Sequence, residues 1–259
     1  MPSLLHPGLF EADGKSLDEV YNYAPFRQSR MFVAGVSCSD CHDPHSLKLR
    51  AEGDGVCLQC HDGGRFAASS HHHHSDASAG ARCTACHMPV KTYMQVDPRH
   101  DHAFRIPRPD ESARFGTSNA CNDCHQDKDA AWAAAAIERW FGPQRKGLQT
   151  WTEAFDAARG SKPEAASLLV KLALSPDAPS IARATALDSL AEFPSREAVA
   201  AAQRALADLE PLVRLSALRS LRPYGAANSW PLAGHLLADP VLGCASKPPR
   251  CWPIRHQIV

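Results

Sequence analysis

The sequence predicts a mainly α-helical protein made of two unlike parts: an irregular, cysteine-rich part followed by an array of short helices. Eight of the ten cysteines lie between Cys38 and Cys124, in a stretch rich in Gly, Pro, Asp, Ser and His that lacks regular apolar spacing. Beyond this stretch the composition changes to Ala, Leu and Arg, and apolar residues recur at helical spacing. Related helical segments then repeat at a fixed interval, which favours a stacked array.

The clustered cysteines form four copies of the string Cys-x-x-Cys-His. This string is typical of covalent c-type haem attachment, because two thiols join the vinyl groups of one porphyrin and the next histidine binds the iron from the same side. We therefore predict four c-type haems. The attaching thiols and iron-binding histidines are Cys38, Cys41, His42, Cys57, Cys60, His61, Cys83, Cys86, His87, Cys121, Cys124 and His125.

Two other uses of paired cysteines compete with haem attachment. The first two pairs are spaced like those of a zinc ribbon, but a zinc ribbon does not require the histidine that follows all four pairs. Disulfides are a weaker alternative, since a two-residue gap repeated four times is a poor framework for joining distant loops. Haem attachment alone accounts for every residue of the repeated string.

Residues 1–127 are therefore predicted to be a haem-packed, irregular tetrahaem domain. The segment 37–126 would enclose four porphyrins, so the haems supply the apolar interior and the chain wraps them in turns and short helices. We expect this part to be unfolded without haem.

The sixth ligand decides what each iron can do: a second His or a Met closes it for electron transfer, whereas an open position admits a substrate. His45 follows a proline that stiffens its segment, and the run of four histidines at 71–74 is expected to supply one or two ligands. Near residue 100, two histidines spaced by two share one side of an extended strand, and we favour the second. The candidate distal ligands are His45, His72, His73, His100 and His102.

Residues 128–243 are predicted to form the helical domain, because apolar residues recur at helical spacing with Pro or Gly between the segments. The predicted helices are Asp129–Phe141, Thr152–Ala158, Pro163–Leu174, Ser180–Phe193, Arg196–Leu209 and Leu212–Leu221.

Two of these helices are related by a shift of 31 residues. Ile181–Phe193 aligns with Leu212–Tyr224, and Arg, Ala, Leu, Ser and Leu coincide. A helix pair recurring at this length resembles a HEAT-type repeat, in which each pair buries its apolar stripe only by stacking on its neighbours. A generic amphipathic helical bundle is the alternative.

Both ends of the chain depart from these patterns. Haem is attached to such motifs outside the cytoplasm, yet residues 1–20 lack the basic start and apolar stretch of a signal peptide, so we expect that the sequence starts late. Residues 244–259 have no helical periodicity, and their prolines oppose a further helix. Read one nucleotide out of phase, the stretch from Cys244 can continue the repeat, so we predict a frameshifted tail in which Cys244 and Cys251 have no function; a terminal disulfide is the alternative.

Charge and hydropathy exclude other classes of partner. The 28 acidic and 28 basic residues balance, so no nucleic-acid partner is predicted. No apolar run approaches the roughly 20 residues that cross a bilayer, so no membrane span is predicted.

Several segments carry a family resemblance. Gly35–Leu49, with a second motif 19 residues on, resembles the doubled CxxCH module of multihaem c-type cytochromes. Tyr93–Pro109 and Asn119–His125 are similar to exported bacterial multihaem proteins related to the cytochrome c554 group, which carry HEAT or tetratricopeptide repeats after the haems. The resemblance covers the chain to about Leu242 and implies a periplasmic or outer-surface electron carrier.

The sequence thus predicts electron transfer through four closely spaced, mostly His/His-ligated haems, with the helical repeats docking redox protein partners. Two alternatives remain. One is a multihaem oxidoreductase that acts on a small nitrogen or sulfur species at one open haem. The other is a scaffold or filament subunit built from the repeats.

Overall fold

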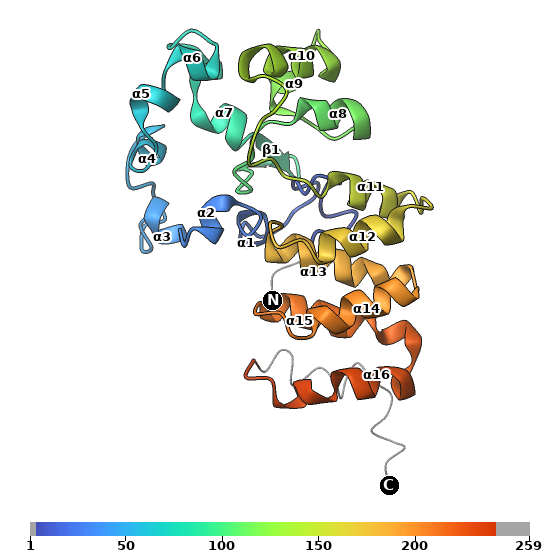
Figure 1. Cartoon of the computed structure of the whole chain (residues 1–259). Helices are drawn as coiled ribbons and strands as arrows, with labels where there is room; N and C mark the ends of the chain where they lie inside the picture. Colours follow the sequence, from blue (N-terminus) through green and yellow to red (C-terminus); the bar gives the residue numbers. More distant parts are fainter. Residues whose placement is uncertain (1–3, 242–259) are drawn as a thin grey trace. The chain divides into compact units, whose positions relative to one another are not determined.

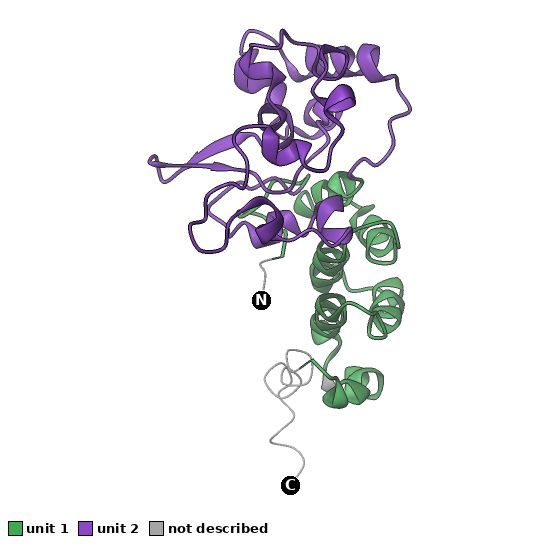
Figure 2. Ribbon diagram, turned by 90° about the vertical axis from the view of Figure 1, so that its left-hand side faces the viewer, with its two compact units in different colours: residues 1–13, 150–259 green, residues 14–149 purple. Residues whose placement is uncertain are grey.

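The computed structural model describes residues 4–241, which divide into two compact units (Figures 1 and 2). One unit comprises residues 14–149, purple in Figure 2. The other comprises the residues from Thr150 onward together with the first thirteen. Helices dominate both units, and the one sheet of the described residues is a two-stranded hairpin, so the predicted mainly α fold class is confirmed.

Short helices joined by turns make up the unit of residues 14–149. A β-hairpin of β1 (Val90–Tyr93) and β2 (Asp97–His100) follows the first seven helices, with Val90 opposite His100. The helices are α1 (Tyr23–Phe26), α2 (Arg30–Val33), α3 (Cys38–Cys41), α4 (Gly55–Leu58), α5 (Gly63–Phe66), α6 (Ser69–His72), α7 (Cys83–His87), α8 (Pro109–Phe115), α9 (Ala120–Cys124) and α10 (Ala130–Phe141), with a 3-10 turn at Ala79–Ala81.

This unit has almost no polypeptide core along its first half. No residue from Arg30 to Thr92 is buried, although α2 to α7 lie within that range. Large apolar side chains stay in contact with solvent there; Val33 is 72% exposed and Leu47 is 73% exposed. Exposed apolar side chains recur along this range, at Val33, Leu47, Leu49, Leu58 and Val90, and a segment that leaves them uncovered while burying no residue points to a partner that completes its interior.

The second unit is a stack of antiparallel helices, α11 (Thr152–Arg159) to α16 (Ala226–Ala233), which follow one another in order in Figure 1. α12 contacts α13, α13 contacts α15, and α14 contacts α15. Leu187 and Leu215 are completely buried between these layers. The helices between the two ends of the stack are α12 (Ala165–Ala173), α13 (Ser180–Ser189), α14 (Arg196–Ala205) and α15 (Pro211–Ser220).

A repeated ion pair follows the 31-residue period of the helical unit. Arg183 binds Asp208 through both terminal nitrogens, at 2.5 and 3.2 Å. One repeat later, Arg214 binds Asp239 through Nε and Nη2, at 2.7 and 3.0 Å. Because both members of the pair shift by the same number of residues, the period seen in the sequence is also a period of the three-dimensional contacts.

The first described residues belong to the helical unit. Leu5 and Phe10 are buried, and the backbone N–H of Leu5 donates to Thr185 Oγ1 at 3.0 Å. Further along, Arg159 donates to the carbonyl of Phe10 at 2.9 Å. The segment 4–13 therefore adds an irregular strip to the core of the helical stack.

This division of the chain differs from the boundary that composition predicts between residues 127 and 128. α10 packs against α8 and α9, so it belongs with the cysteine-rich unit. The six predicted helices are present as α10 to α15, with ends shifted by a few residues; the helix predicted to run to Phe193 ends at Ser189, and a 3-10 turn at Leu190–Glu192 follows it. The predicted tail of residues 244–259 lies outside the described residues.

Within residues 4–241, no helix is both long enough and apolar enough to cross a lipid bilayer.

Candidate haem-binding sites

Each Cys-x-x-Cys-His string forms one helical turn. The backbone N–H groups of His42, His61 and His125 donate to the carbonyl of the first cysteine of their own motif, at 2.9, 3.0 and 2.9 Å. The third motif lies entirely within α7. Positions i, i+3 and i+4 share one face of a helical turn, so both thiols and the imidazole of each motif point the same way. This is the arrangement that attachment to one porphyrin requires.

Three of the four motif histidines have a second imidazole nearby. The ring centres of His42 and His102 are 6.3 Å apart. Those of His87 and His71 are 6.2 Å apart, with planes inclined by 11°. Those of His125 and His74 are also 6.2 Å apart.

This repeated distance matches the spacing of two axial ligands. An imidazole nitrogen lies about 1.1 Å from its ring centre and a metal–imidazole bond is about 2.0 Å long, so two rings bound to opposite sides of one metal have centres roughly 6.2 Å apart. The three pairs thus have the spacing that one iron between two histidines requires.

Hydrogen bonds fix which nitrogen the rings of His42, His87 and His102 present. His42 Nδ1 donates to the carbonyl of Leu47 at 3.0 Å, and His87 Nδ1 donates to that of Arg105 at 2.6 Å. On the opposite side, His102 Nδ1 donates to the carbonyl of His100 at 2.9 Å. A histidine whose Nδ1 proton is held by a carbonyl carries its free lone pair on Nε2, which is the usual arrangement of a metal-binding histidine.

Burial favours the uncharged, metal-binding form of three of these rings. It lowers the pKa of His71, His87 and His102 below the ordinary value of 6.5. For His71, the neighbouring His87 lowers the pKa further, whereas the Arg105 carbonyl opposes the shift at His87. A neutral imidazole keeps the lone pair that an iron ligand must donate.

The second motif differs from the other three. His61 is exposed, and its ring meets Phe66 edge-on, with centres 5.6 Å apart. Among residues 4–241 no second imidazole faces His61 at the distance seen in the other motifs. This motif is therefore the one for which the described residues provide no paired histidine.

The other sequence candidates have different surroundings. His45 is exposed, and only its backbone N–H has a partner, the Asp43 carboxylate at 3.2 Å. His72 Nδ1 accepts the N–H of His74, which places its ring proton on Nε2, 3.6 Å from an Asp76 oxygen. His73 stacks on Trp140 in α10, with ring centres 4.4 Å apart.

His100 keeps an available Nε2, because its Nδ1 donates to the carbonyl of Met88 at 2.7 Å, but no motif histidine faces its ring within the described residues. Of the five sequence candidates, the structure brings only His102 opposite a motif histidine. His71 and His74 occupy such positions, although nothing in the sequence distinguishes them within the run of four. Which residues of the run face inward depends on where α6 ends, and no residue type marks that point.

Neighbouring motifs lie next to one another in chain order. Burial and the nearby Cys57 raise the pKa of Cys41, which places the first motif beside the second. Burial, the Asp54 carboxylate and Cys57 raise the pKa of Cys83 to about 12, which links the second and third motifs. α7 contacts α9, so the third motif adjoins the fourth.

One side chain joins the second motif to the third. Asp54 is the N-cap residue of α4, which carries Cys57, and its Oδ1 accepts the backbone N–H of Cys83 at 3.1 Å. The carboxylate therefore holds the start of α7 against the start of α4.

The residues present fit c-type haem better than the competing uses of cysteine. All eight motif cysteines are free thiols in the described chain. A structural zinc ion needs four donors around one point, and within residues 4–241 no three His, Cys, Asp or Glu side chains form such a group. What recurs instead is a pair of imidazoles beside two thiols, in a segment whose apolar side chains lack a protein core.

Comparison with known families supports this assignment for the first two motifs. The family model described as the doubled CXXCH motif matches residues 31–66, which contain both motifs and the loop between them. Neither the curated proteins nor the solved structures gave a match to this chain. The doubled motif implies a haem-binding c-type cytochrome of the multihaem kind, with covalently bound c-type haem.

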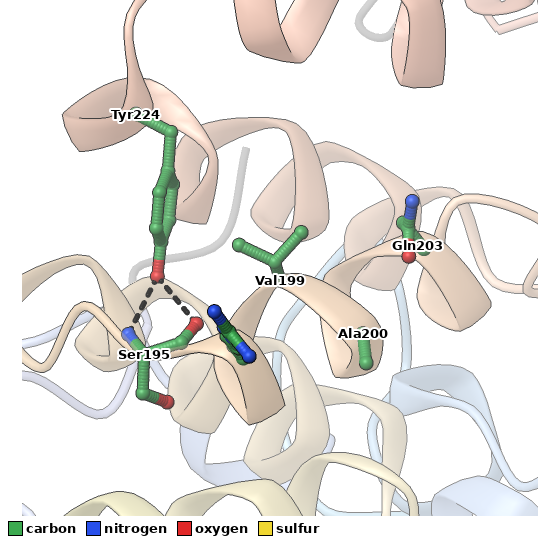
Figure 3. A pocket seen from close by; sticks show the side chains of 6 residues that line it. Ser195, Val199, Ala200, Gln203 and Tyr224 are labelled. Atoms are coloured by element: carbon green, nitrogen blue, oxygen red, sulfur yellow. Dashed lines mark hydrogen bonds between the residues drawn. The ribbon is translucent and has the colours of Figure 1, made fainter.

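The helical unit carries a separate, mainly apolar depression of about 380 Å³ (Figure 3). Val199 and Ala200 of α14 line it beside Tyr224. The Tyr224 hydroxyl accepts the backbone N–H of Ser195 at 2.8 Å and donates to the Ser195 carbonyl at 3.0 Å, so its ring is fixed at the edge of the depression.

Proposed function

We propose that this chain is a tetrahaem c-type cytochrome that transfers electrons between redox protein partners outside the cytoplasm. The observation that carries the proposal is the recurrence of a second imidazole 6.2–6.3 Å from three of the four motif histidines. An iron with two histidine ligands has no position left for substrate, which suits electron transfer rather than catalysis.

The chain's own residues prepare these sites for rapid electron exchange. Bound c-type haem supplies the reversible one-electron chemistry of its iron. The carbonyls of Leu47 and Arg105 hold His42 and His87 in fixed orientations, so the ligands need not rearrange when the charge of the site changes.

The order of the motifs supports a chain of haems. The first motif adjoins the second, the second adjoins the third, and the third adjoins the fourth. Four porphyrins attached at these neighbouring turns would form a continuous path for electrons.

Cellular location and partner follow from the same chemistry. Proteins with c-type haem are typically exported, so we place this chain in the periplasm or at the cell surface. The helical unit offers repeat surfaces and the depression beside Tyr224 for a redox partner.

The haem count and the ligation can be measured on the purified holoprotein. We expect its denatured mass to exceed that of the chain by four haems, and the ferric protein to show low-temperature EPR signals of low-spin, His/His-ligated iron. A double variant, Cys121→Ser with Cys124→Ser, should lose one haem and keep three. A denatured mass with fewer than four haems would contradict the tetrahaem proposal.

The second motif favours a second candidate function, oxidoreduction of a small nitrogen or sulfur species. His61 is exposed and faces no second imidazole among the described residues, so an iron bound there would keep a position for an added ligand. The measurement is titration of the ferric protein with cyanide, nitrite and hydroxylamine. A high-spin signal equivalent to one haem, abolished by cyanide, would support this candidate; a wholly low-spin protein that ignores all three would exclude it.

A further inference from the structure

The four consecutive histidines at 71–74, here called the histidine strap, join two sites of the cysteine-rich unit. The outer two face different motif histidines: His71 lies opposite His87 of the third motif, and His74 lies opposite His125 of the fourth. The inner two face neither. A single short segment therefore reaches two neighbouring haem motifs.

The backbone of the strap explains how adjacent residues reach separate sites. α6 ends at His72, and the N–H of His73 donates to the carbonyl of Ser69 at 2.9 Å. His73 itself has φ 54° and ψ 30°, the left-handed conformation, which is energetically costly for a non-glycine residue. This reversal turns the chain between His71 and His74, and a conformation of this cost persists only where its surroundings hold it.

The side chains around His72 and His73 stabilise this conformation. His73 stacks on Trp140, with planes inclined by only 10°, and Phe141 meets the same ring edge-on. The His72 ring accepts the N–H of His74, and the His74 ring donates to the carbonyl of His72 at 2.5 Å. The strap is thus tied both to α10 and to itself.

Gly80 leaves the space that the His74 ring occupies. A Cβ atom placed on Gly80 would lie 2.4 Å from Cδ2 and 2.8 Å from Nε2 of His74. The φ of Gly80 is outside the left-handed region, so its backbone does not require glycine. The need for glycine comes from the imidazole.

We propose that the strap supplies the sixth ligand to two irons, His71 at the third motif and His74 at the fourth, and that Gly80 and Trp140 are positioning residues for it. This inference rests on the proposed function, because it assumes haem at both motifs. Its consequence is that the two proposed ligands, His71 and His74, are joined by only three peptide bonds. A substitution of Trp140, which contacts His73 between them, should therefore alter the ligation of both haems.

Gly80→Ala tests the position of His74 without changing any ligand. We expect the variant to retain four covalent haems by mass and to lose the low-spin EPR signal of one haem, about a quarter of the total, with a high-spin signal in its place. Gly63→Ala is the matched control, because a Cβ there meets only Leu58, at 3.8 Å, and should leave the spectrum unchanged. A Gly80→Ala spectrum identical to the parent's overturns the role of Gly80.

Ligand rescue separates direct ligation from a structural role. His74→Gly should lose one low-spin signal and regain it when free imidazole is added, since the small ligand replaces the missing ring. His235→Gly, the control, changes an exposed histidine of the helical unit and should keep the parental spectrum with or without imidazole. If His74→Gly keeps every low-spin signal, His74 is not a ligand. If the parent protein carries fewer than four haems, the proposed function itself is wrong, and the two failures are thereby distinguished.

Trp140 tests the coupling of the two sites. We expect Trp140→Ala to shift the EPR signals and the midpoint potentials of two haems, and Trp140→Phe, which keeps an aromatic face for His73, to restore both. The first-motif haem, opposite His102, should be unaffected. A change confined to one haem would overturn the coupling, whatever the haem count.

Discussion

No residue from 30 to 92 is buried as a whole, whereas in the helical unit α13 and α15 bury Ile181, Leu187, Val213 and Leu215 completely. Both segments fold into short α-helices with the same backbone hydrogen bonding. They differ in how far protein covers the apolar side chains: neighbouring helices bury them in the helical unit, whereas Val33 and Leu47 stay exposed in residues 30–92.

The comparison shows that secondary structure and a core are separable properties of a chain. Capping bonds fix the starts of α3 and α9, and the i+4 bonds of His42, His61 and His125 close the turns of the first, second and fourth motifs. Such local bonds are worth about 1 kcal/mol each and cannot by themselves offset the entropy of ordering a long segment. We therefore expect residues 30–92 to depend on a bound group for the stability that the helical unit obtains from leucine and alanine.

The largest expected effect follows from removing haem. Replacing all eight motif cysteines with serine should leave residues 30–92 unfolded while α12 to α15 stay folded. Hydrogen exchange followed by mass spectrometry should show protection falling by roughly 10³-fold or more in the first segment and remaining in the second. Equal loss of protection in both would show that the two units fold as one.

A core substitution in the helical unit should destabilise that unit and leave the cysteine-rich unit unchanged. Leu187 is completely buried, so Leu187→Ala should lower the free energy of unfolding by about 3–5 kcal/mol through lost burial and the cavity it leaves. Thermal unfolding followed by circular dichroism measures the loss, and the haem spectrum should not change. Leu209→Ala is the control, because Leu209 is 95% exposed and its removal should cost less than about 0.5 kcal/mol.

The parts of the fold that sequence predicts are those determined by local spacing. The Cys-x-x-Cys-His strings specify their own helical turns, and the 31-residue shift between Ile181 and Leu212 specifies the stacked pairs. The placement of residues 4–13 in the helical core was not predictable, since Leu5 and Phe10 form no periodic pattern and their partners lie far along the chain.

The residues of the candidate site also fall into those that local spacing predicts and those that long-range packing determines. His42 and the other motif histidines are identified by the motif; the sequence favours His102 over His100, and the structure places the His102 ring opposite His42. The strap could not be resolved into outer and inner residues, because that depends on the left-handed conformation of His73 and its contact with Trp140, more than sixty residues away. Long-range packing of this kind leaves no trace in local spacing.

A smaller effect is expected from breaking the repeated ion pair. Arg214→Ala leaves the buried Asp239 carboxylate without its bidentate partner, and should lower the free energy of unfolding by about 3 kcal/mol. The double variant with Asp239→Ala should cost less than the two single changes together, because it removes both charges. Arg222→Ala, at an exposed position of the same unit, should be nearly neutral; additive effects in the cycle would show that the pair is not coupled.

The smallest effect is the pH dependence that the same pair confers. Hydrogen bonds from Arg214 lower the pKa of Asp239 below its ordinary value of 3.8. A carboxylate whose pKa is lower in the folded state stabilises the fold above the pKa of the unfolded chain, and this stabilisation is lost as pH falls through the folded-state pKa. The free energy of unfolding should therefore fall below about pH 3.8 in the parent and fall less steeply in Asp239→Asn, as urea titrations between about pH 2 and about pH 6 would measure. Equal slopes in the two proteins would contradict the assignment, because the haem motifs are intact in both and only a difference in slope reports on Asp239.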